Sequence, residues 1–385
     1  MPTNPYDTAQ ALGINNIGSA GPPRRERRRR RQSLRWGAGI AAAALVLAAC
    51  GGSSTSNKAS STGSAPPSPA KTKLSLITFP GTYYFTDAVA QQEGFFNKEN
   101  LSVQFIKPQA GTSALQLLLS GTVNGLINDG ALSVLAASKG QDIKIVGSIY
   151  NKNAWRIYAS DKVASLSASN LGFPAAIQAL KGKTIGVTSI GAGTDLAVQA
   201  IVRAAGMNPS TDVHRVGIGL LQAAVGQFQA GRIDAYVFNQ PADSVLGDAH
   251  LAHPFFDFAT QAPAEFANVP QGTLITTGSY LSGHQAVVQR WITAEEDAMH
   301  WIQDPANAQK AGALFASSYG GTVSAGVSTV KFLDSEVYPS TAPGLKVSQS
   351  LFNNEVKLLT TVGLLKPGVA SYNQIVAPSA QVAGG

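Results

Sequence analysis

The chain has 385 residues, of which 44% are hydrophobic and 13% are charged, and its Lys and Arg residues outnumber its Asp and Glu residues by 29 to 22. The first 49 residues hold eight of the basic residues but only Asp7 and Glu26, so the rest of the chain is balanced at 21 to 20. This balance excludes a basic nucleic-acid-binding surface as the main feature of the folded part. Because Cys50 is the only cysteine, an intramolecular disulfide is excluded as well.

The N-terminal segment has the order that is typical of a cleaved export signal. Eight arginines between Arg24 and Arg35 precede the mostly apolar residues 36–49, a run that is too short to span a bilayer. The run ends in Leu-Ala-Ala-Cys at Cys50, which resembles the lipobox of bacterial lipoproteins. The resemblance implies that residues 1–49 are a signal peptide and that acyl chains on Cys50 anchor the mature protein to the extracytoplasmic face of the cell membrane.

Two further features of this region concern export and anchoring. Residues 30–35, Arg-Arg-Gln-Ser-Leu-Arg, resemble a twin-arginine signal, so the general and the twin-arginine export routes are both open. Residues 50–71 are mostly Ser, Gly, Ala, Pro and Thr, a composition that predicts a flexible tether. A flexible chain of this length spans about 25 Å, so we expect the folded part near the membrane surface but not pressed against it.

After the tether, short β-rich runs alternate with amphipathic helical stretches. Glycines follow both helical stretches, as is common at helix ends, and they stand at Gly94 and Gly121. The pattern predicts, in chain order, a strand over 73–79, a helix over 84–93, a strand over 101–106, a helix over 113–120 and a strand over 123–127. The order is therefore βαβαβ.

The same order recurs further along the chain. It predicts a strand over 183–188, a helix over 195–205, a strand over 213–216, a helix over 220–230 and a strand over 233–238. Three landmarks repeat at offsets of 112, 112 and 110 residues, namely Gly81 with Gly193, Gly94 with Gly206, and Gly121 with Gly231. The near-constant offset predicts two α/β lobes of similar construction.

The last part of the chain is expected to be helical, over 287–302 and 351–365. The extended-looking stretches 146–159 and 273–277 are expected to cross between the lobes as a two-strand hinge. The predicted division is lobe I over 72–158 and 272–385, and lobe II over 159–271. The fold class is α/β, a two-lobed clamp with C-terminal helices.

In such a clamp, a ligand binds in the crevice where strands end and helices begin. Aromatic side chains there can stack on a ligand, and helix starts offer N–H groups. Trp155 either lines the crevice or packs in the hinge. The expected ligand-binding residues are Pro80, Gly81, Thr82, Tyr83, Tyr84, Gly111, Thr112, Ser113, Asn128, Asp129, Trp155, Gly191, Gly193, Thr194, Asp195, Asn239 and Gln240.

Several catalytic and cofactor patterns are incomplete. The run from Gly191 to Leu196 has two glycines of a dinucleotide fingerprint but Leu196 at the third position, so it predicts a helix start. This start is either capped by Thr194 or offers its N–H groups to an anion or a polar ligand, which the clamp geometry favours. A Gly-x-Ser-x-Gly nucleophile elbow is absent. His250 and His253 have no acidic neighbours at ligand spacing. We therefore expect no catalytic residue, no metal site and no cofactor.

Four short motifs make the chain resemble a known family. They are Ala-x-x-x-Gly-Phe-Phe at 90–96, Leu-Lys-Gly-Lys-Thr-Ile-Gly-Val at 180–187, Gly-Arg-Ile-Asp-Ala at 231–235 and Ala-Met-His-Trp-Ile at 298–302. The chain is similar to the periplasmic-binding-protein-like II receptors for aliphatic sulfonates, taurine, nitrate and thiamine precursors. The resemblance implies a monomeric, extracytoplasmic solute-binding lipoprotein that passes a small molecule to the ABC permease of an importer and does not bind nucleic acid.

Two questions stay open at this point. The solute is either uncharged or aromatic, such as a pyrimidine, or an anion of the sulfonate or nitrate kind, since none of the five arginines after Cys50 falls in the predicted loops. The alternative function is an enzyme of the same fold, pyrimidine-forming or desulfinase-like. The resemblance implies that such enzymes can use cysteine, and no cysteine follows Cys50, so we expect a binding protein.

Overall fold

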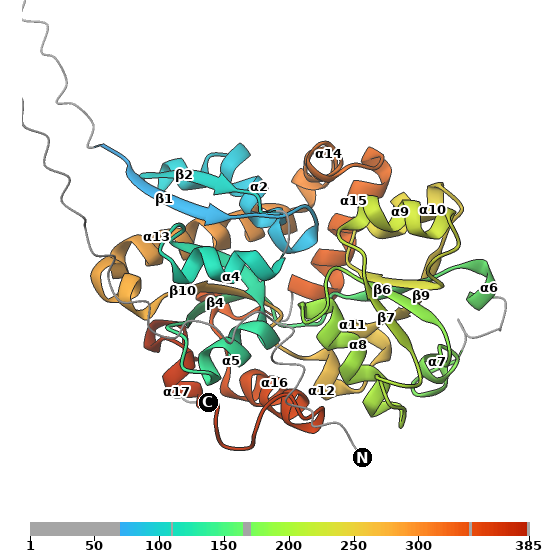
Figure 1. Cartoon of the computed structure of the whole chain (residues 1–385). Coiled ribbons are helices and arrows are strands. Elements are labelled where there is room, and N and C mark those ends of the chain that lie inside the picture. Colours follow the sequence, from blue (N-terminus) through green and yellow to red (C-terminus); the bar gives the residue numbers. More distant parts are fainter. Residues whose placement is uncertain (1–69, 109–110, 165–170, 339–340, 383–385) are drawn as a thin grey trace, which may run out of the picture. The chain divides into compact units, whose positions relative to one another are not determined.

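The computed structural model describes residues 70–108, 111–164, 171–338 and 341–382 (Figure 1). The expected signal peptide over 1–49, Cys50 and nearly all of the tether lie outside the described residues. Within them, no helix combines the length and the apolar character that a membrane crossing requires.

One five-stranded sheet forms from the first part of the chain and one later strand. Its order is β2-β1-β3-β10-β4, with β1 parallel to both β2 and β3, and with β10 antiparallel to β3 and β4. The strands are β1 (Thr72–Ile77), β2 (Leu101–Ile106), β3 (Gly125–Asp129), β4 (Lys144–Tyr150) and β10 (Gly272–Thr276).

A second five-stranded sheet has the same arrangement, in the order β7-β6-β8-β5-β9. Here β6 is parallel to β7 and β8, while β5 is antiparallel to β8 and β9. The strands are β5 (Arg156–Ala159), β6 (Thr184–Val187), β7 (His214–Gly217), β8 (Ala235–Phe238) and β9 (His253–Asp257). Because each sheet begins with three parallel strands joined by helices, the predicted repeat of two βαβαβ units is confirmed.

The crossings between the sheets differ in part from the prediction. The first consists of residues 151–155, which join β4 to β5. The expectation that residues 273–277 cross is wrong, because β10 is a buried inner strand of the first sheet, bonded on both sides. The second crossing instead runs over 258–271 and contains α11 and α12. An apolar, β-rich run shows that a strand exists, but not which sheet it joins.

Helices cover both sheets (Figure 1). Those of the first part are α2 (Phe85–Gln92), α3 (Phe95–Lys98), α4 (Gly111–Leu119) and α5 (Gly130–Ser138), with the 3₁₀ turn η2 (Thr82–Tyr84). Those that accompany the second sheet are α6 (Asp161–Ala164), α7 (Ala175–Gln178), α8 (Gly193–Ala204), α9 (Leu221–Gln229), α10 (Ala242–Asp248), α11 (Phe258–Gln261) and α12 (Ala264–Ala267). The C-terminal helices are α13 (Gly278–Gln303), α14 (Ala308–Tyr319), α15 (Val323–Phe332), α16 (Gln349–Thr361) and α17 (Tyr372–Ile375). The 3₁₀ turns η4 (Pro305–Asn307) and η7 (Pro343–Leu345) and the π-helical segment η5 (Leu333–Val337) lie between them, and the 3₁₀ turn η8 (Pro378–Ala380) follows α17.

The alternation of side chains along β3 places two helices on opposite faces of the first sheet. On one face, the ring of Trp291 in α13 occupies the space that a side chain at Gly125 would need, 2.6 Å from its Cβ position. On the other face, the amide of Asn128 donates to Ser133 Oγ of α5 at 3.1 Å. The network continues from Ser133 to Thr273 of β10 at 3.0 Å. These contacts fix the carboxyl end of β3 and the start of α5.

Two glycines allow α14 and α15 to pack in close contact. A Cβ at Gly326 would lie 2.1 Å from the carbonyl oxygen of Gly312, which the structure cannot accommodate without moving a helix. By contrast, a Cβ at Gly226 in α9 has no atom within 4 Å. The two positions therefore form a matched pair of helical glycines, one packed and one free.

We expect Gly326→Ala to lower the free energy of unfolding by about 1–3 kcal/mol, because overpacking forces a shift of packed elements. Gly226→Ala is the control and should raise it by about 0.4–1 kcal/mol, because alanine restricts the unfolded chain and favours helix. Urea unfolding of both variants measures the two changes. Equal effects of both substitutions would contradict the close contact of α14 and α15.

Candidate functional site

A cavity of about 100 Å³ lies between residues that follow the strands of the two sheets. From the first sheet it takes residues after β1 and at the end of β3, and from the second sheet residues after β6 and β8. The lining residues are Phe79, Pro80, Tyr83, Tyr84, Ala114, Asn128, Asp129, Leu132, Trp155, Thr188, Ala192, Gly193, Thr194, Leu220, Phe238 and Asn239. This is the position at which open α/β sheets bind ligands.

Aromatic rings form a continuous wall of the cavity. Tyr83 and Trp155 stack at 4.9 Å between ring centroids with 26° between their planes. Tyr84 lies next to Tyr83 at 6.4 Å and next to Phe79 at 5.5 Å, while Phe238 lies 6.4 Å from Trp155. The expectation for Trp155 is that it either lines the crevice or packs in the hinge. It lies in the first crossing between the sheets and lines the cavity from there, so it does both.

Tyr83 is held in place by the short turn η2. The hydroxyl of Tyr150 donates to the carbonyl of Thr82, and the N–H of Thr82 donates to the carbonyl of Gln240 at 3.3 Å. Burial raises the pKa of Tyr83 well above its ordinary value, and the nearby Asp129 raises it further. The Tyr83 hydroxyl and Asn239 Oδ1 are buried and make no hydrogen bond within the described part of the chain. Both atoms are therefore available to a bound molecule.

Asp129 is the one lining residue with a charged side chain. Its Oδ1 accepts from the N–H groups of Ala131 at 3.0 Å and Leu132 at 3.4 Å, and it thereby caps α5. Burial raises the pKa of Asp129 to about 6, while these two N–H groups and the Trp155 side chain oppose the shift. At neutral pH the cavity therefore contains a half-buried carboxylate.

The Asp129 carboxylate also meets the second sheet's helix α8. A Cβ at Gly193, in the first turn of α8, would lie 2.8 Å from the Asp129 carboxyl carbon, so only glycine leaves room. A second buried acid lies behind this contact, since burial and then the charge of Asp129 raise the pKa of Glu355 well above its ordinary value. Glu355 stands in α16, and no local pattern in the sequence indicated that it reaches the site.

Thr194 has a different role from the one expected. The N-cap residue, which precedes the first turn of α8, is Ala192, and no side chain caps the helix. The prediction that Thr194 caps it is therefore wrong. Its hydroxyl instead binds the N–H of Thr188 at 3.0 Å and the Thr188 hydroxyl at 2.9 Å. Thr194 thus shapes the loop after β6 and lines the cavity at the same time.

Asp195 does not face the cavity, contrary to the expectation. It is fully buried, forms an ion pair with Arg215 of β7, and accepts from the N–H of Gly191 and from Gln199, each at 2.9 Å. An acidic residue in the first turn of a helix suits the helix dipole. Its partner, 20 residues further along the chain, could not be identified from local sequence.

The other expected residues divide into two groups. The structure brings nine of them to the cavity, namely Pro80, Tyr83, Tyr84, Asn128, Asp129, Trp155, Gly193, Thr194 and Asn239. It places six outside the lining, namely Gly81, Thr82, Ser113, Gly191, Asp195 and Gln240, while the side chains at Gly111 and Thr112 lie outside the described part of the chain. Lining residues that the sequence did not indicate are Phe79, Ala114, Leu132, Thr188, Ala192, Leu220 and Phe238. Most of these are apolar and resemble ordinary core residues in sequence.

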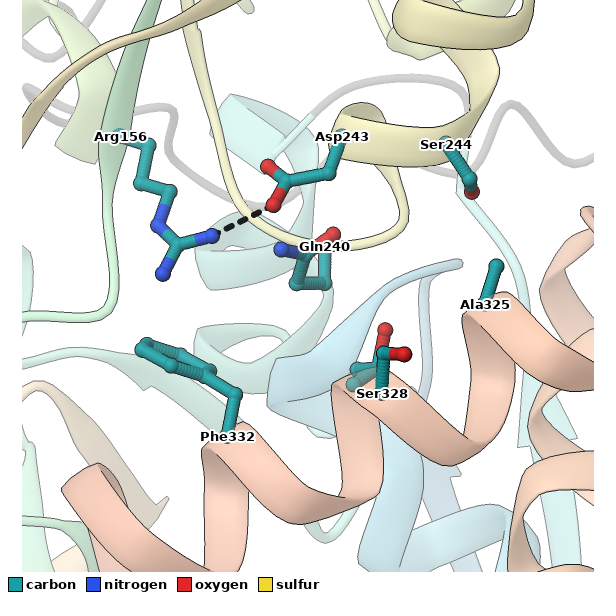
Figure 2. A pocket seen from close by; sticks show the side chains of 8 residues that line it. Arg156, Gln240, Asp243, Ser244, Ala325, Ser328 and Phe332 are labelled. Atoms are coloured by element: carbon teal, nitrogen blue, oxygen red, sulfur yellow. Dashed lines mark hydrogen bonds and ion pairs between the residues drawn. The ribbon is translucent and has the colours of Figure 1, made fainter.

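A second hollow, of about 110 Å³, lies around Arg156 (Figure 2). The guanidinium of Arg156 donates to Asp243 and Asp257, each at 2.6 Å, and lies 4.3 Å from the centre of the Phe332 ring. Ser328 and Phe332, both on α15, form the opposite wall (Figure 2). Two carboxylates thus neutralise Arg156, the arginine closest to the predicted crevice, so it is not free to bind an anion.

Within the described ranges, no group of three or more His, Cys, Asp or Glu side chains is placed to hold a metal ion.

Comparison with known proteins identifies the family. Residues 82–308, more than half of the chain, match the family described as NMT1/THI5 like, and the chain belongs to this family. No curated protein matches the sequence.

Solved structures with a similar fold are binding proteins from several bacteria. The alkanesulfonate-binding protein SsuA from Xanthomonas axonopodis pv. citri superposes with a TM-score of 0.63 at 16% identity, covering 82% of this chain and 99% of that one. The periplasmic nitrate-binding protein NrtA from Synechocystis PCC 6803 gives 0.63 at 12% identity, with 77% and 83% covered. The ligand-binding component of an ABC-type import system from Staphylococcus aureus gives 0.63 at 14%, with 80% and 98% covered.

The same fold also occurs in an enzyme. The desulfurization enzyme DszB superposes with a TM-score of 0.53 at 16% identity, covering 79% of this chain and 96% of that one. These likenesses establish the periplasmic-binding-protein-like fold, whereas the family is shown by the match over residues 82–308. The choice between binding and catalysis depends on the cavity itself.

We expect Asp129→Asn to stabilise the protein at pH 8, by about 2–3 kcal/mol for a pKa raised by about two units. A raised pKa means that the wild-type acid contributes full stability below about pH 4, and that this contribution is lost as the pH rises through about 6. Asparagine keeps the cap of α5 and carries no charge. Urea unfolding between pH 4 and pH 8 measures the difference.

The stability difference between Asp129→Asn and the wild type should shrink toward pH 4, where both side chains are neutral. The control is Asp248→Asn, an exposed position, which should leave the pH dependence as it is. An Asp129→Asn variant that is no more stable than the wild type at pH 8 would show that the carboxylate is not desolvated.

Proposed function

We propose that this protein is the extracytoplasmic solute-binding lipoprotein of an ABC importer and that it takes up one small organic solute in the cavity between its two sheets. The observation that carries the proposal is the cavity's composition. An aromatic wall, a half-buried carboxylate and two buried polar atoms without partners converge on one space at the ends of strands from both sheets. Such a space, mostly apolar with a few oriented polar groups, is typical of a small-molecule site.

The way the cavity is built supports binding by closure. Residues from both sheets form its walls. The two walls contact each other where the N–H of Thr82 donates to the carbonyl of Gln240 and where the Asp129 carboxylate lies against Gly193. A solute that bridges these walls would favour the arrangement in which they are close together. The family and the similar fold of an ABC import component are consistent with this role.

The anchor belongs to the same proposal. The lipobox-like sequence ending at Cys50 would leave a lipid on the first residue of the mature chain, and residues 50–71 would connect that lipid to the folded part. The protein would then work close to its permease, on the outer face of the cell membrane. The proposed division of the folded part follows the expected one, with 72–158 and 272–385 in lobe I and 159–271 in lobe II, except that β5 belongs to the second sheet, so the boundary moves into the first crossing at 151–155.

An enzyme of this fold is the alternative, and one observation favours it. Asp129 has a pKa of about 6, close to the pH at which a general base works best. However, Cys50 is the only cysteine in the chain, so the cavity has no thiol nucleophile. Turnover of a bound solute that is lost in Asp129→Asn would favour the enzyme.

A thermal-shift screen of the full-length chain tests the solute-binding proposal. The panel is sulfonates, taurine, nitrate, pyrimidines and flavins, and at least one class should raise the melting temperature. A solute at 100 times its dissociation constant adds about 2.7 kcal/mol to the free energy of unfolding. If no small solute shifts the transition, the proposal is wrong.

The same screen with variants locates the site. We expect Tyr83→Leu to weaken the shift at least about tenfold in apparent affinity, because it removes a stacking ring worth on the order of 1 kcal/mol and a polar contact. Tyr280→Leu, on α13 and outside the cavity, is the control and should bind like the wild type. Unchanged affinity in Tyr83→Leu would remove the aromatic wall from the binding site.

The anchor is tested separately in a bacterial host. The wild-type chain should incorporate a labelled fatty acid and fractionate with membranes, whereas Cys50→Ser should not be labelled, because serine lacks the thiol that is acylated. Mass spectrometry of the mature N-terminus should begin at Cys50. Labelling that persists in Cys50→Ser would contradict the proposed anchor.

A further inference from the structure

The charge inside the cavity limits which solutes can enter it. Among the described lining residues none is Lys, Arg or His, and Asp129 alone carries a charge. Two arginines of the second sheet are already paired, Arg156 with Asp243 and Asp257, and Arg215 with Asp195. An anionic solute would therefore lose its hydration without gaining a cationic partner, and it would lie beside a half-buried carboxylate.

The other device that binds anions, a helix N-terminus, is also in use. The first turn of α8 has no side-chain cap, and its N–H groups could in principle receive an anion. However, the Asp129 carboxylate lies against Gly193 in that first turn. The protein's own carboxylate thus lies beside this helix start, where it would repel a sulfonate or nitrate.

The aromatic wall has the opposite preference. The rings of Phe79, Tyr84, Tyr83, Trp155 and Phe238 follow one another at centroid distances of 4.9–6.4 Å around the cavity. Aromatic faces attract cations, most strongly where water is excluded, and cages of such rings are used to bind organic ammonium groups. A carboxylate beside the rings adds a direct ion-pair partner.

A second acid lies close to Asp129. Glu355 is 3% exposed, and burial first and the charge of Asp129 second raise the pKa of Glu355 well above its ordinary value, so its neutral form is favoured beside Asp129. Two acids therefore lie close together with no basic side chain among the lining residues. A cationic solute would relieve this unfavourable arrangement.

From these contacts we infer that the solute carries a positively charged nitrogen, an ammonium, amidinium or protonated ring nitrogen, which binds the Asp129 carboxylate while its carbon framework packs against the aromatic wall. The inference rests on the proposed function, since it specifies the class of solute that the same cavity receives. A cavity of about 100 Å³ is somewhat smaller than an engineered cavity of about 150 Å³ that binds benzene. Probes with one small ring therefore suit its size.

Three probes with one ring and different charge test the inference by isothermal titration calorimetry of the full-length chain at pH 8. They are benzamidine, which is cationic, benzamide, which is neutral and of nearly the same shape, and benzenesulfonate, which is anionic. Benzamidine should bind at least about tenfold more tightly than the other two, because a charged hydrogen bond and a cation–π contact are added.

Asp129→Asn should remove the preference for benzamidine over benzamide, and it keeps the cap of α5, so the fold is preserved. Asp248→Asn removes an exposed charge elsewhere and should keep the preference. Lowering the pH of the wild type through about 6 should weaken benzamidine binding as Asp129 becomes protonated. The Asp248→Asn control and the pH titration therefore distinguish a direct contact with Asp129 from a general effect of the protein's net charge.

The inference is overturned if benzamide or benzenesulfonate binds as tightly as benzamidine, if Asp129→Asn keeps the preference, or if none of the three probes binds. The thermal-shift screen of solutes tests the proposed receptor function separately. If a sulfonate or an uncharged pyrimidine binds in that screen, the receptor function is supported and only the inference of a cationic solute is refuted.

Discussion

The cavity depends on the half-buried carboxylate of Asp129, which contacts helices that accompany both sheets. One oxygen caps α5 at the end of β3, and the carboxylate lies against the first turn of α8 at Gly193. A buried charge is costly unless hydrogen bonds or an opposite charge compensate it. Two backbone N–H groups and the Trp155 side chain provide only part of that compensation, so the carboxyl group has a pKa of about 6. A group kept in this condition is more typical of a functional site than of a structural one.

Around this carboxylate, the fold supplies rigid support. The network of Asn128, Ser133 and Thr273 ties the end of β3 to α5 and β10. Tyr150 holds the turn that presents Tyr83 to the cavity. The site is therefore built on strands and helix starts rather than on long loops. Arg156 and Arg215, which could have bound an anion, are each paired with acids of the second sheet, and this leaves the cavity with one sign of charge.

Much of this arrangement could be predicted from the sequence, because it follows local patterns. Alternating strands and helices, and the recurrence of Gly81 at Gly193, predicted the two similar units, and nine of the expected residues line the cavity. The errors concern contacts between distant segments. Residues 273–277 have the composition of a strand, and only the sheet shows that they lie inside the first one. Asp195 is paired with Arg215, and Glu355 reaches Asp129 from α16, and neither contact leaves a signal in the local sequence.

A crystal structure of the protein with the solute that gives the largest thermal shift would locate the binding site. We expect one solute molecule in the cavity between the sheets, in contact with the rings of Tyr83 and Trp155 and within hydrogen-bond distance of Asp129. A solute bound in the hollow around Arg156 instead, with the cavity beside Asp129 unchanged, would contradict the assignment of the site.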